Sequence, residues 1–150
     1  MPLRRVTPAE RDAAVNAIEE FAAKIGNGTI NFNDNARMHV HAGMVLRSKL
    51  QEKVDVIPIE VHFIRLGNIA FATNPYELFL DYGNQIKARS KASQTFLIQL
   101  SCGSYGYLPT EKAEKGSHYS AYVSSGTAGH EGGELLVRKT VSEINDMLKK

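Results

Sequence analysis

The sequence predicts an α/β fold, in which a small mixed sheet is packed with helices. Three observations support this. Apolar residues recur at helical spacing up to about residue 53, and apolar alternation begins at Val54. An apolar run, a helical stretch and a second apolar run then follow one another, which is typical of a parallel crossover. We therefore expect one domain over residues 1–150, helical over 1–53 and α/β over 54–150.

The composition is that of a single soluble globular domain. The chain has 150 residues, 43% of them hydrophobic and 23% charged, and its net charge of +2 comes from 18 basic and 16 acidic residues. These charges are interspersed, so we expect no nucleic-acid partner. The one cysteine, Cys102, excludes an internal disulfide and a cysteine-rich zinc module. The opening residues, MPLRRVTPAERD, lack the apolar segment of a signal peptide, and no stretch approaches the length of a membrane span.

Two helices are predicted in the first third of the chain. Thr7-Pro8-Ala9-Glu10 combines a capping residue, a proline at the first helical position and an acid at the third, and apolar residues then recur up to Ile25. Gly26-Asn27-Gly28 is expected to end this helix. A second helix is predicted from about Asp34 to Glu52, with one apolar side.

A hairpin is predicted next. The stretch VDVIPIEVHFIRL, residues 54–66, alternates with a period of two and predicts a strand bent at Pro58. Leu66-Gly67-Asn68 supplies a tight turn before the apolar run IAFAT, Ile69–Thr73. This order favours an antiparallel hairpin whose second strand is interior.

A crossover and a last helix complete the prediction. PYELFLDYGNQIKARS is expected to be helical, and TFLIQL, Thr95–Leu100, is expected to be a buried strand parallel to Ile69–Thr73. Ligands of such sheets collect outside the carboxyl ends of the strands. The segment HEGGELLVRKTVSEINDMLKK predicts a final helix, preceded by the glycine-rich loop SSGTAGHEGG, which lacks the lysine and hydroxyl pair of a phosphate loop.

Glu77 is the first candidate functional residue, and two interpretations fit it. It lies three residues after Asn74 with Pro75 between them, so it suits the third helical position of a capping arrangement. It also follows the carboxyl end of a predicted strand, where a ligand would bind. The local sequence favours the cap.

The sequence around five other polar residues indicates no functional site. His39 and His41 have a spacing that suits a metal on a strand, yet they fall in a predicted helix, where side chains two apart diverge. His118 and His130 lie in predicted loops without a nearby acid, and Ser125 has no recognisable nucleophile setting. We interpret all five as ordinary structural or surface residues.

Two motifs flank the predicted crossover. Asn74-Pro75-Tyr76-Glu77 follows its first strand, GSYGYLPT (residues 103–110) follows its second, and Tyr119 lies twelve residues after Tyr107. With this spacing, the segment 60–141 resembles the C-terminal part of the catalytic domain of the neutral (alkaline, non-lysosomal) ceramidase family. There a Pro-Gly-Glu motif follows one strand and a Tyr-x-Gly-Tyr-x-Pro-Thr loop follows the next. Tyr76 departs from the first motif, and Ser104 stands at the first tyrosine of the second.

The resemblance implies roles for three residues. Glu77 and Tyr107 correspond to two of four zinc ligands, and Tyr119 corresponds to a tyrosine facing the scissile amide. The other two family ligands are histidines expected outside this chain, so the chain would be the C-terminal portion of a neutral ceramidase-like catalytic domain and a fragment of a larger α/β domain. We expect it to be inactive as an isolated fragment and to hold no zinc tightly on its own.

The implied activity is zinc-dependent hydrolysis of an N-acyl amide to an amine and a fatty acid. The implied partners are the upstream part of the parent catalytic domain and a lipid-like amide substrate, and the implied location is secreted, periplasmic or membrane-associated. Two alternatives remain open: a non-enzymatic binding module, and a hydrolase-derived scaffold that has lost its metal.

Two structural expectations follow. The predicted sheet has few strands and apolar residues on both faces, so we expect an open edge or apolar face that makes the chain a homodimer. If the implied roles hold, Glu77 and Tyr107 should lie on the same edge of the sheet, with Tyr119 lining the same hollow.

Overall fold

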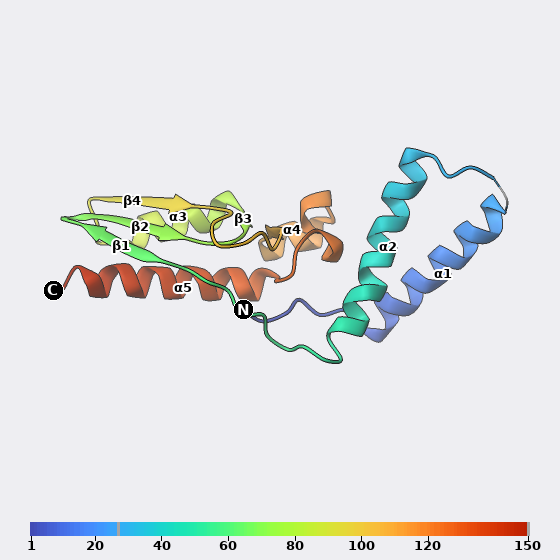
Figure 1. Cartoon of the computed structure of the whole chain (residues 1–150), viewed down its shortest axis with the longest axis horizontal. Coiled ribbons are helices and arrows are strands. Elements are labelled where there is room, and N and C mark those ends of the chain that lie inside the picture. The colour runs from blue at the N-terminus through green and yellow to red at the C-terminus, as the bar shows by residue number, and fades with distance from the viewer. Residues whose placement is uncertain (27, 150) are drawn as a thin grey trace.

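The chain has the mixed α/β architecture expected from its sequence (Figure 1). The computed structural model describes residues 1–26 and 28–149, so Asn27 of the predicted helix stop lies outside the described residues. Within the described part, a three-stranded sheet and a separate two-stranded pair are combined with five α-helices. The first two helices form a hairpin at one end of the molecule, and the three-stranded sheet lies at the other (Figure 1).

The helical hairpin confirms the predicted N-terminal helices. Helix α1 spans Pro8–Ile25 and begins with a capping box, in which the Glu10 amide donates to Thr7 Oγ1 at 3.2 Å and the Thr7 amide donates to Glu10 Oε2 at 2.8 Å. Helix α2 spans Phe32–Leu50 and begins slightly earlier than predicted, because the Asn31 side chain caps it.

Arg47 of α2 anchors this hairpin to the rest of the molecule. The residue is only 8% exposed, and burial lowers the pKa of its guanidinium. Its two terminal nitrogens donate four hydrogen bonds of 2.7–3.3 Å to main-chain carbonyl oxygens, those of Arg4, Val123, Gly126 and Thr127. The same helix packs so closely on the 123–127 segment that a Cβ on Gly43 would lie 2.3 Å from Ser124 Cβ. Helix α2 and this segment therefore hold each other in place.

The predicted strand over residues 54–66 is wrong in its first part. Strand β1 covers only Phe63–Leu66, and the residues before it form one isolated antiparallel bridge, between Val56 and Pro2. No neighbouring strand runs alongside that stretch in the described chain, so its alternating pattern reflects the packing of Ile59 and Val61 on the core. The predicted hairpin itself is confirmed: β1 pairs antiparallel with β2, Ile69–Thr73, across a turn in which Gly67 has φ +62°.

The predicted parallel crossover is confirmed as well. Helix α3, Leu80–Arg89, connects the central strand β2 to its parallel neighbour β4, Gln94–Ile98. The prediction that this last strand is buried is wrong, because Phe96 and Ile98 are 45% and 44% exposed. Their side chains lie on the sheet face opposite to the helices.

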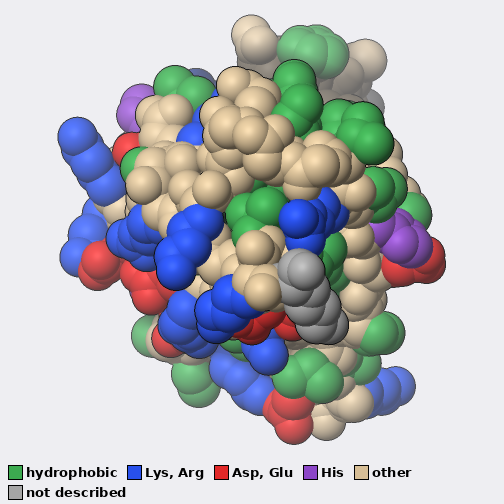
Figure 2. All heavy atoms as spheres, turned by 90° about the vertical axis from the view of Figure 1, so that its left-hand side faces the viewer, with side chains coloured by type: hydrophobic (Ala, Val, Ile, Leu, Met, Phe, Trp, Pro, Cys, Tyr) green, Lys and Arg blue, Asp and Glu red, His purple; other side chains and the backbone are tan. Residues whose placement is uncertain are grey.

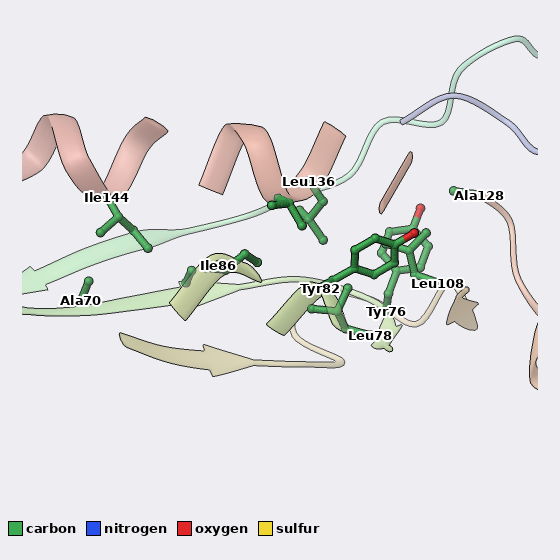
Figure 3. Packing of buried hydrophobic residues seen from close by; sticks show 11 residues of the cluster. Ala70, Tyr76, Leu78, Tyr82, Ile86, Leu108, Ala128, Leu136 and Ile144 are labelled. Carbon is green, nitrogen blue, oxygen red and sulfur yellow. The ribbon is translucent and has the colours of Figure 1, made fainter. Parts of the chain in front are cut away.

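The core lies between the sheet and the pair α3 and α5, the latter spanning His130–Met147 (Figure 3). Tyr82 of α3 reaches between the elements and donates to the carbonyl oxygen of Pro109 at 2.9 Å. A Cβ on Gly133 would lie 2.2 Å from the Tyr82 ring, so this glycine in the first turn of α5 makes room for the tyrosine. The cluster consists of three alanines and eight larger residues, namely Ala70, Ala72, Tyr76, Leu78, Tyr82, Ile86, Leu108, Ala128, Leu136, Val137 and Ile144.

The end of the molecule that carries the β1–β2 turn is rich in basic side chains, with acidic ones among them (Figure 2). Lys87 and Arg89 lie in the last turn of α3, where cations interact favourably with the helix dipole. Arg65 of β1 donates to the carbonyl oxygen of Met147 at 2.6 Å and so satisfies the C-terminal end of α5. None of the helices in the described residues is long and apolar enough to cross a bilayer.

Candidate functional site

Glu77 lies on a strand, and both the helix start and the capping role predicted for it are wrong. Glu77 and Leu78 form the short strand β3, and α3 begins only at Leu80. The Asn74 side chain accepts from the Tyr76 amide at 3.0 Å, so it closes a turn and caps no helix. The amide of Glu77 donates to the carbonyl oxygen of Gly106 at 3.0 Å, and this pairing holds the backbone extended.

The partner strand brings Tyr107 directly beside Glu77. Strand β5, Tyr107–Leu108, pairs in parallel with β3, and Glu77 is opposite Tyr107 in this register. Side chains alternate along a strand, so the buried neighbours Tyr76 and Leu78 point into the core while Glu77 points away from it. Glu77 and Tyr107 lie side by side, as the sequence predicted, but on a two-stranded pair separate from the three-stranded sheet and not on an edge of that sheet.

Tyr119 completes the cluster from a third segment. It begins the short 3₁₀ helix η1, Tyr119–Ala121, and its hydroxyl is hydrogen-bonded to that of Tyr107. The two rings meet edge to face, with centroids 5.4 Å apart and planes at 80°. Hydrogen bonds to Tyr119 and then to Glu77 raise the pKa of the Tyr107 hydroxyl, so Tyr107 is a neutral phenol at neutral pH. We call Glu77, Tyr107 and Tyr119 the Glu–Tyr–Tyr cluster.

Close backbone contacts fix the segment that carries Tyr119. A second 3₁₀ helix, η2, spans Val123–Ser125, and Gly126 after it forms an isolated bridge with Gly106, next to β5. A Cβ on Gly126 would lie 2.1 Å from the Tyr107 carbonyl oxygen, and one on Gly106 would lie 2.2 Å from the Ser125 carbonyl oxygen. Only glycine allows the two backbones to approach this closely. The loop before α5 is therefore part of the site's framework.

Tyr119 also lines a hollow of about 360 Å³ against α2. The wall is mostly apolar, with a few polar side chains, and consists of Phe32, Asn35, Ala36, His39, Val40, Tyr119, Tyr122, Ser124 and Ser125. Of the Glu–Tyr–Tyr cluster only Tyr119 belongs to this wall. The expectation that Tyr119 lines the same hollow as Glu77 and Tyr107 is therefore wrong, although its hydroxyl does contact that of Tyr107.

The cluster offers part of a zinc site. A carboxylate oxygen and a phenol oxygen are donors that zinc accepts, and Glu77 and Tyr107 present them from opposite positions on adjacent strands. A catalytic zinc takes three or more protein ligands. In residues 1–26 and 28–149, Glu77 belongs to no group of three or more His, Cys, Asp or Glu side chains close enough to share an ion. The donor types therefore fit zinc, but the described residues supply two ligands only.

The histidines lie as follows. His39 and His41 are on α2, as the sequence predicted, and His118 precedes η1. His130 does have an acidic neighbour, because its Nδ1 lies 2.8 Å from Glu114 Oε2 and its amide donates to Glu114 Oε1 at 2.8 Å. Glu114 comes from α4, Glu111–Gly116, so nothing in the sequence near His130 could have indicated the pair.

No family model, no curated protein and no solved structure matches this chain. Function must therefore be inferred from the arrangement of the chain's own side chains.

Proposed function

We propose that the chain is the C-terminal part of the catalytic domain of a zinc-dependent amide hydrolase of the neutral ceramidase kind, which converts an N-acyl amide to an amine and a fatty acid. One observation carries the proposal. Glu77, Tyr107 and Tyr119, the three residues to which the sequence resemblance assigns roles, come from three segments and lie together, because Glu77 is opposite Tyr107 in the β3–β5 pair and the Tyr107 hydroxyl is hydrogen-bonded to that of Tyr119.

Glu77 and Tyr107 would serve as two of the zinc ligands. Zinc, when bound, supplies Lewis acidity that polarises an amide carbonyl and lowers the pKa of a water molecule. The β3–β5 pairing holds the two oxygen donors on adjacent strands, so little ordering is needed when they bind an ion. Tyr107 would give up its phenolic proton on ligation.

Tyr119 would act on the substrate. Its side chain is 66% exposed, and its hydroxyl lies next to that of Tyr107, so it can donate a hydrogen bond to the oxygen of an amide bound at the cluster. A donor placed where negative charge develops is a common source of rate acceleration in acyl transfer. The apolar hollow beside Tyr119 suits the hydrocarbon part of an N-acyl amide.

The departure at Tyr76 does not obstruct this arrangement. Its side chain is fully buried, packs against Tyr105 at a centroid distance of 5.9 Å and lies 3.4 Å from Thr127 Oγ1 through its hydroxyl. The tyrosine that replaces the family's glycine therefore fills core volume and leaves the space over Glu77 open. Two further ligands, expected from outside this chain, would complete the site.

A second candidate is a binding module without metal. The hydrogen bond between the Tyr107 and Tyr119 hydroxyls favours it, because these two groups satisfy each other without any ion. In that case the hollow beside Tyr119 would hold an apolar ligand and the chain would catalyse nothing.

The experiment is an assay of N-acyl amide hydrolysis by the natural full-length protein, with and without a chelator, followed by zinc re-addition. We expect activity that the chelator abolishes and zinc restores, and a loss of most of it in Glu77→Gln and Tyr107→Phe. Glu19→Gln on the exposed side of α1 and Tyr105→Phe in the core are the matched controls and should stay active. If the protein is folded but shows no hydrolysis that a chelator abolishes, the binding module would be favoured.

A further inference from the structure

We propose that Glu60, His62 and Cys102 form a second metal site, which binds one zinc-like divalent ion independently of the Glu–Tyr–Tyr cluster. One ligand atom from each residue, a carboxylate oxygen, an imidazole nitrogen and the thiol sulfur, lies within 4.8 Å of the others. It is the one group of three or more such side chains at this spacing in the described residues. We call it the Glu–His–Cys cluster.

The elements that carry the cluster are fixed by main-chain bonds. His62 is opposite Thr73 just before β1, because its amide donates to Thr73 Oγ1 at 2.8 Å and its carbonyl oxygen accepts from the Thr73 amide at 3.0 Å. Glu60 lies two residues earlier in the same extended stretch, where side chains two apart share a face. Its Oε1 is 2.8 Å from His62 Nε2, so these two donors already face each other.

Cys102 reaches the pair from the loop after β4. The amide of Asn74 donates to the Ile98 carbonyl oxygen at 2.9 Å, and the amide of Ser101 donates to the Asn74 carbonyl oxygen at 3.0 Å. These bonds join the carboxyl ends of β2 and β4, which point the same way in Figure 1. Cys102 follows with φ +61°, a sharp change of direction for a residue other than glycine. The thiol thereby comes to the His62 side of the sheet end.

The donor set selects the ion. Thiolate, imidazole and carboxylate together suit zinc or cobalt, whereas calcium and magnesium prefer oxygen ligands alone. A tetrahedral ion spaces its ligand atoms roughly 3.3–3.7 Å apart, so Glu60 and His62 would separate slightly, and the Cys102 sulfur, within 4.8 Å of both, would move in by no more than roughly 1.5 Å. Binding releases the thiol proton to solvent and leaves a fourth position for water.

The consequence is a link between two segments. An ion held there joins the extended stretch before β1 to the loop that leads from β4 to Tyr107. The sequence predicts that this chain holds no zinc tightly, because Glu77 and Tyr107 are its two expected ligands. In that prediction, the one cysteine only excluded a disulfide and a cysteine-rich zinc module. The Glu–His–Cys cluster changes that expectation.

Cobalt titration of the chelator-treated, reduced chain tests the proposal. Cobalt bound to a thiolate gives a charge-transfer absorption, and Cys102 is the one cysteine in the sequence, so this band reports on that residue alone. We expect the band to saturate at one ion per chain and zinc to abolish it by displacement. Cys102→Ser should remove it, and His62→Gln or Glu60→Gln should weaken cobalt binding at least about tenfold, since even indirect partners of metal ligands are worth that much.

Matched variants distinguish metal binding at this site from binding at other histidines or at the Glu–Tyr–Tyr cluster. His39→Gln, another histidine outside the cluster, should leave the titration unchanged. The double variant Glu77→Gln/Tyr107→Phe should also retain the band. The proposed amide hydrolase function and the proposed metal site are therefore tested independently of each other. Three results would overturn the proposal: no thiolate band, a band at one ion per two chains, or full affinity in folded His62→Gln and Glu60→Gln proteins.

Discussion

The hydroxyl groups of Tyr107 and Tyr119 are hydrogen-bonded, although one residue lies on a strand of a parallel pair and the other begins a 3₁₀ helix. The contact depends on how closely the 119–126 segment approaches β5. The carbonyl oxygen of Tyr107 lies too close to Gly126 to leave room for a Cβ there, so this glycine sets the distance between β5 and the 119–126 segment.

Gly126→Ala should therefore separate the two tyrosines. A Cβ 2.1 Å from the Tyr107 carbonyl oxygen forces the segments apart, and we expect a loss of roughly 1–3 kcal/mol in the free energy of unfolding. Urea unfolding measures the loss, and NMR nuclear Overhauser contacts between the two rings report on their separation. Gly83→Ala in α3 is the control, since its Cβ would meet only a Leu97 methyl group at 3.5 Å, and it should be neutral or stabilising. Intact ring contacts in Gly126→Ala would show that the glycine does not set this distance.

Arg47→Met should detach the helical hairpin. The substitution removes four hydrogen bonds and leaves buried carbonyl oxygens without their donor, so we expect a loss of about 2–4 kcal/mol in the free energy of unfolding. Arg47→Lys should recover only part of it, because a single ammonium group cannot reach all four oxygens. Equal stability of the methionine and wild-type proteins would contradict the anchoring role.

The capping box of α1 should make stability depend on pH. Hydrogen bonds from the Thr7 amide and hydroxyl hold the pKa of Glu10 below its usual value. The stabilisation is thus present above the unfolded pKa of about 4.3 and is lost as the pH falls through the lower, folded value. Glu10→Gln should lose less stability than wild type between pH 7 and pH 3 in urea unfolding, whereas Glu19→Gln in the same helix should behave as wild type. An unchanged acid response in Glu10→Gln would count against the box.

The exposed sheet face should make the chain self-associate. Phe71 and Phe96 stack there with centroids 5.0 Å apart, and the exposed apolar residues around them are Ile64, Leu66 and Ile98. Light scattering should show dimers of the wild-type chain and a shift to monomers in Phe96→Thr, a substitution that suits an exposed strand position. Gln85→Thr in α3, away from this face, should not change the association. A wild-type monomer across a wide concentration range would contradict the prediction.

Local signals in the sequence predict much of the fold. The Thr7 cap, the turn at Gly67 and the alternation of strand, helix and strand each depend on neighbours in the chain, and each is found where expected. The errors occur where contacts between segments far apart in the sequence determine the structure. Glu77 has the neighbours of a helix start, yet its amide pairs with Gly106, and no rule of local sequence includes that partner.

For the candidate sites too, contacts between residues far apart in the chain were the ones that local sequence could not predict. The resemblance pointed to Glu77, Tyr107 and Tyr119. The β3–β5 pairing brings the first two together, and the bridge between Gly106 and Gly126 brings the segment of Tyr119 to them. The Glu–His–Cys cluster was missed because Cys102 is far from Glu60 and His62 in the chain, although the alternation of Glu60 and His62 was a usable signal. The pair of His130 and Glu114 was missed for the same reason.

The most direct test of the proposed function is a crystal structure of the natural full-length protein grown with zinc, with anomalous scattering measured at the zinc edge. We predict an anomalous peak bonded to a Glu77 carboxylate oxygen and the Tyr107 phenolic oxygen at about 2.0–2.2 Å, with further ligands from outside this chain. A second peak at Glu60, His62 and Cys102 would not affect this result. Zinc absent from Glu77 and Tyr107, with the hydrogen bond between Tyr107 and Tyr119 intact, would contradict the account.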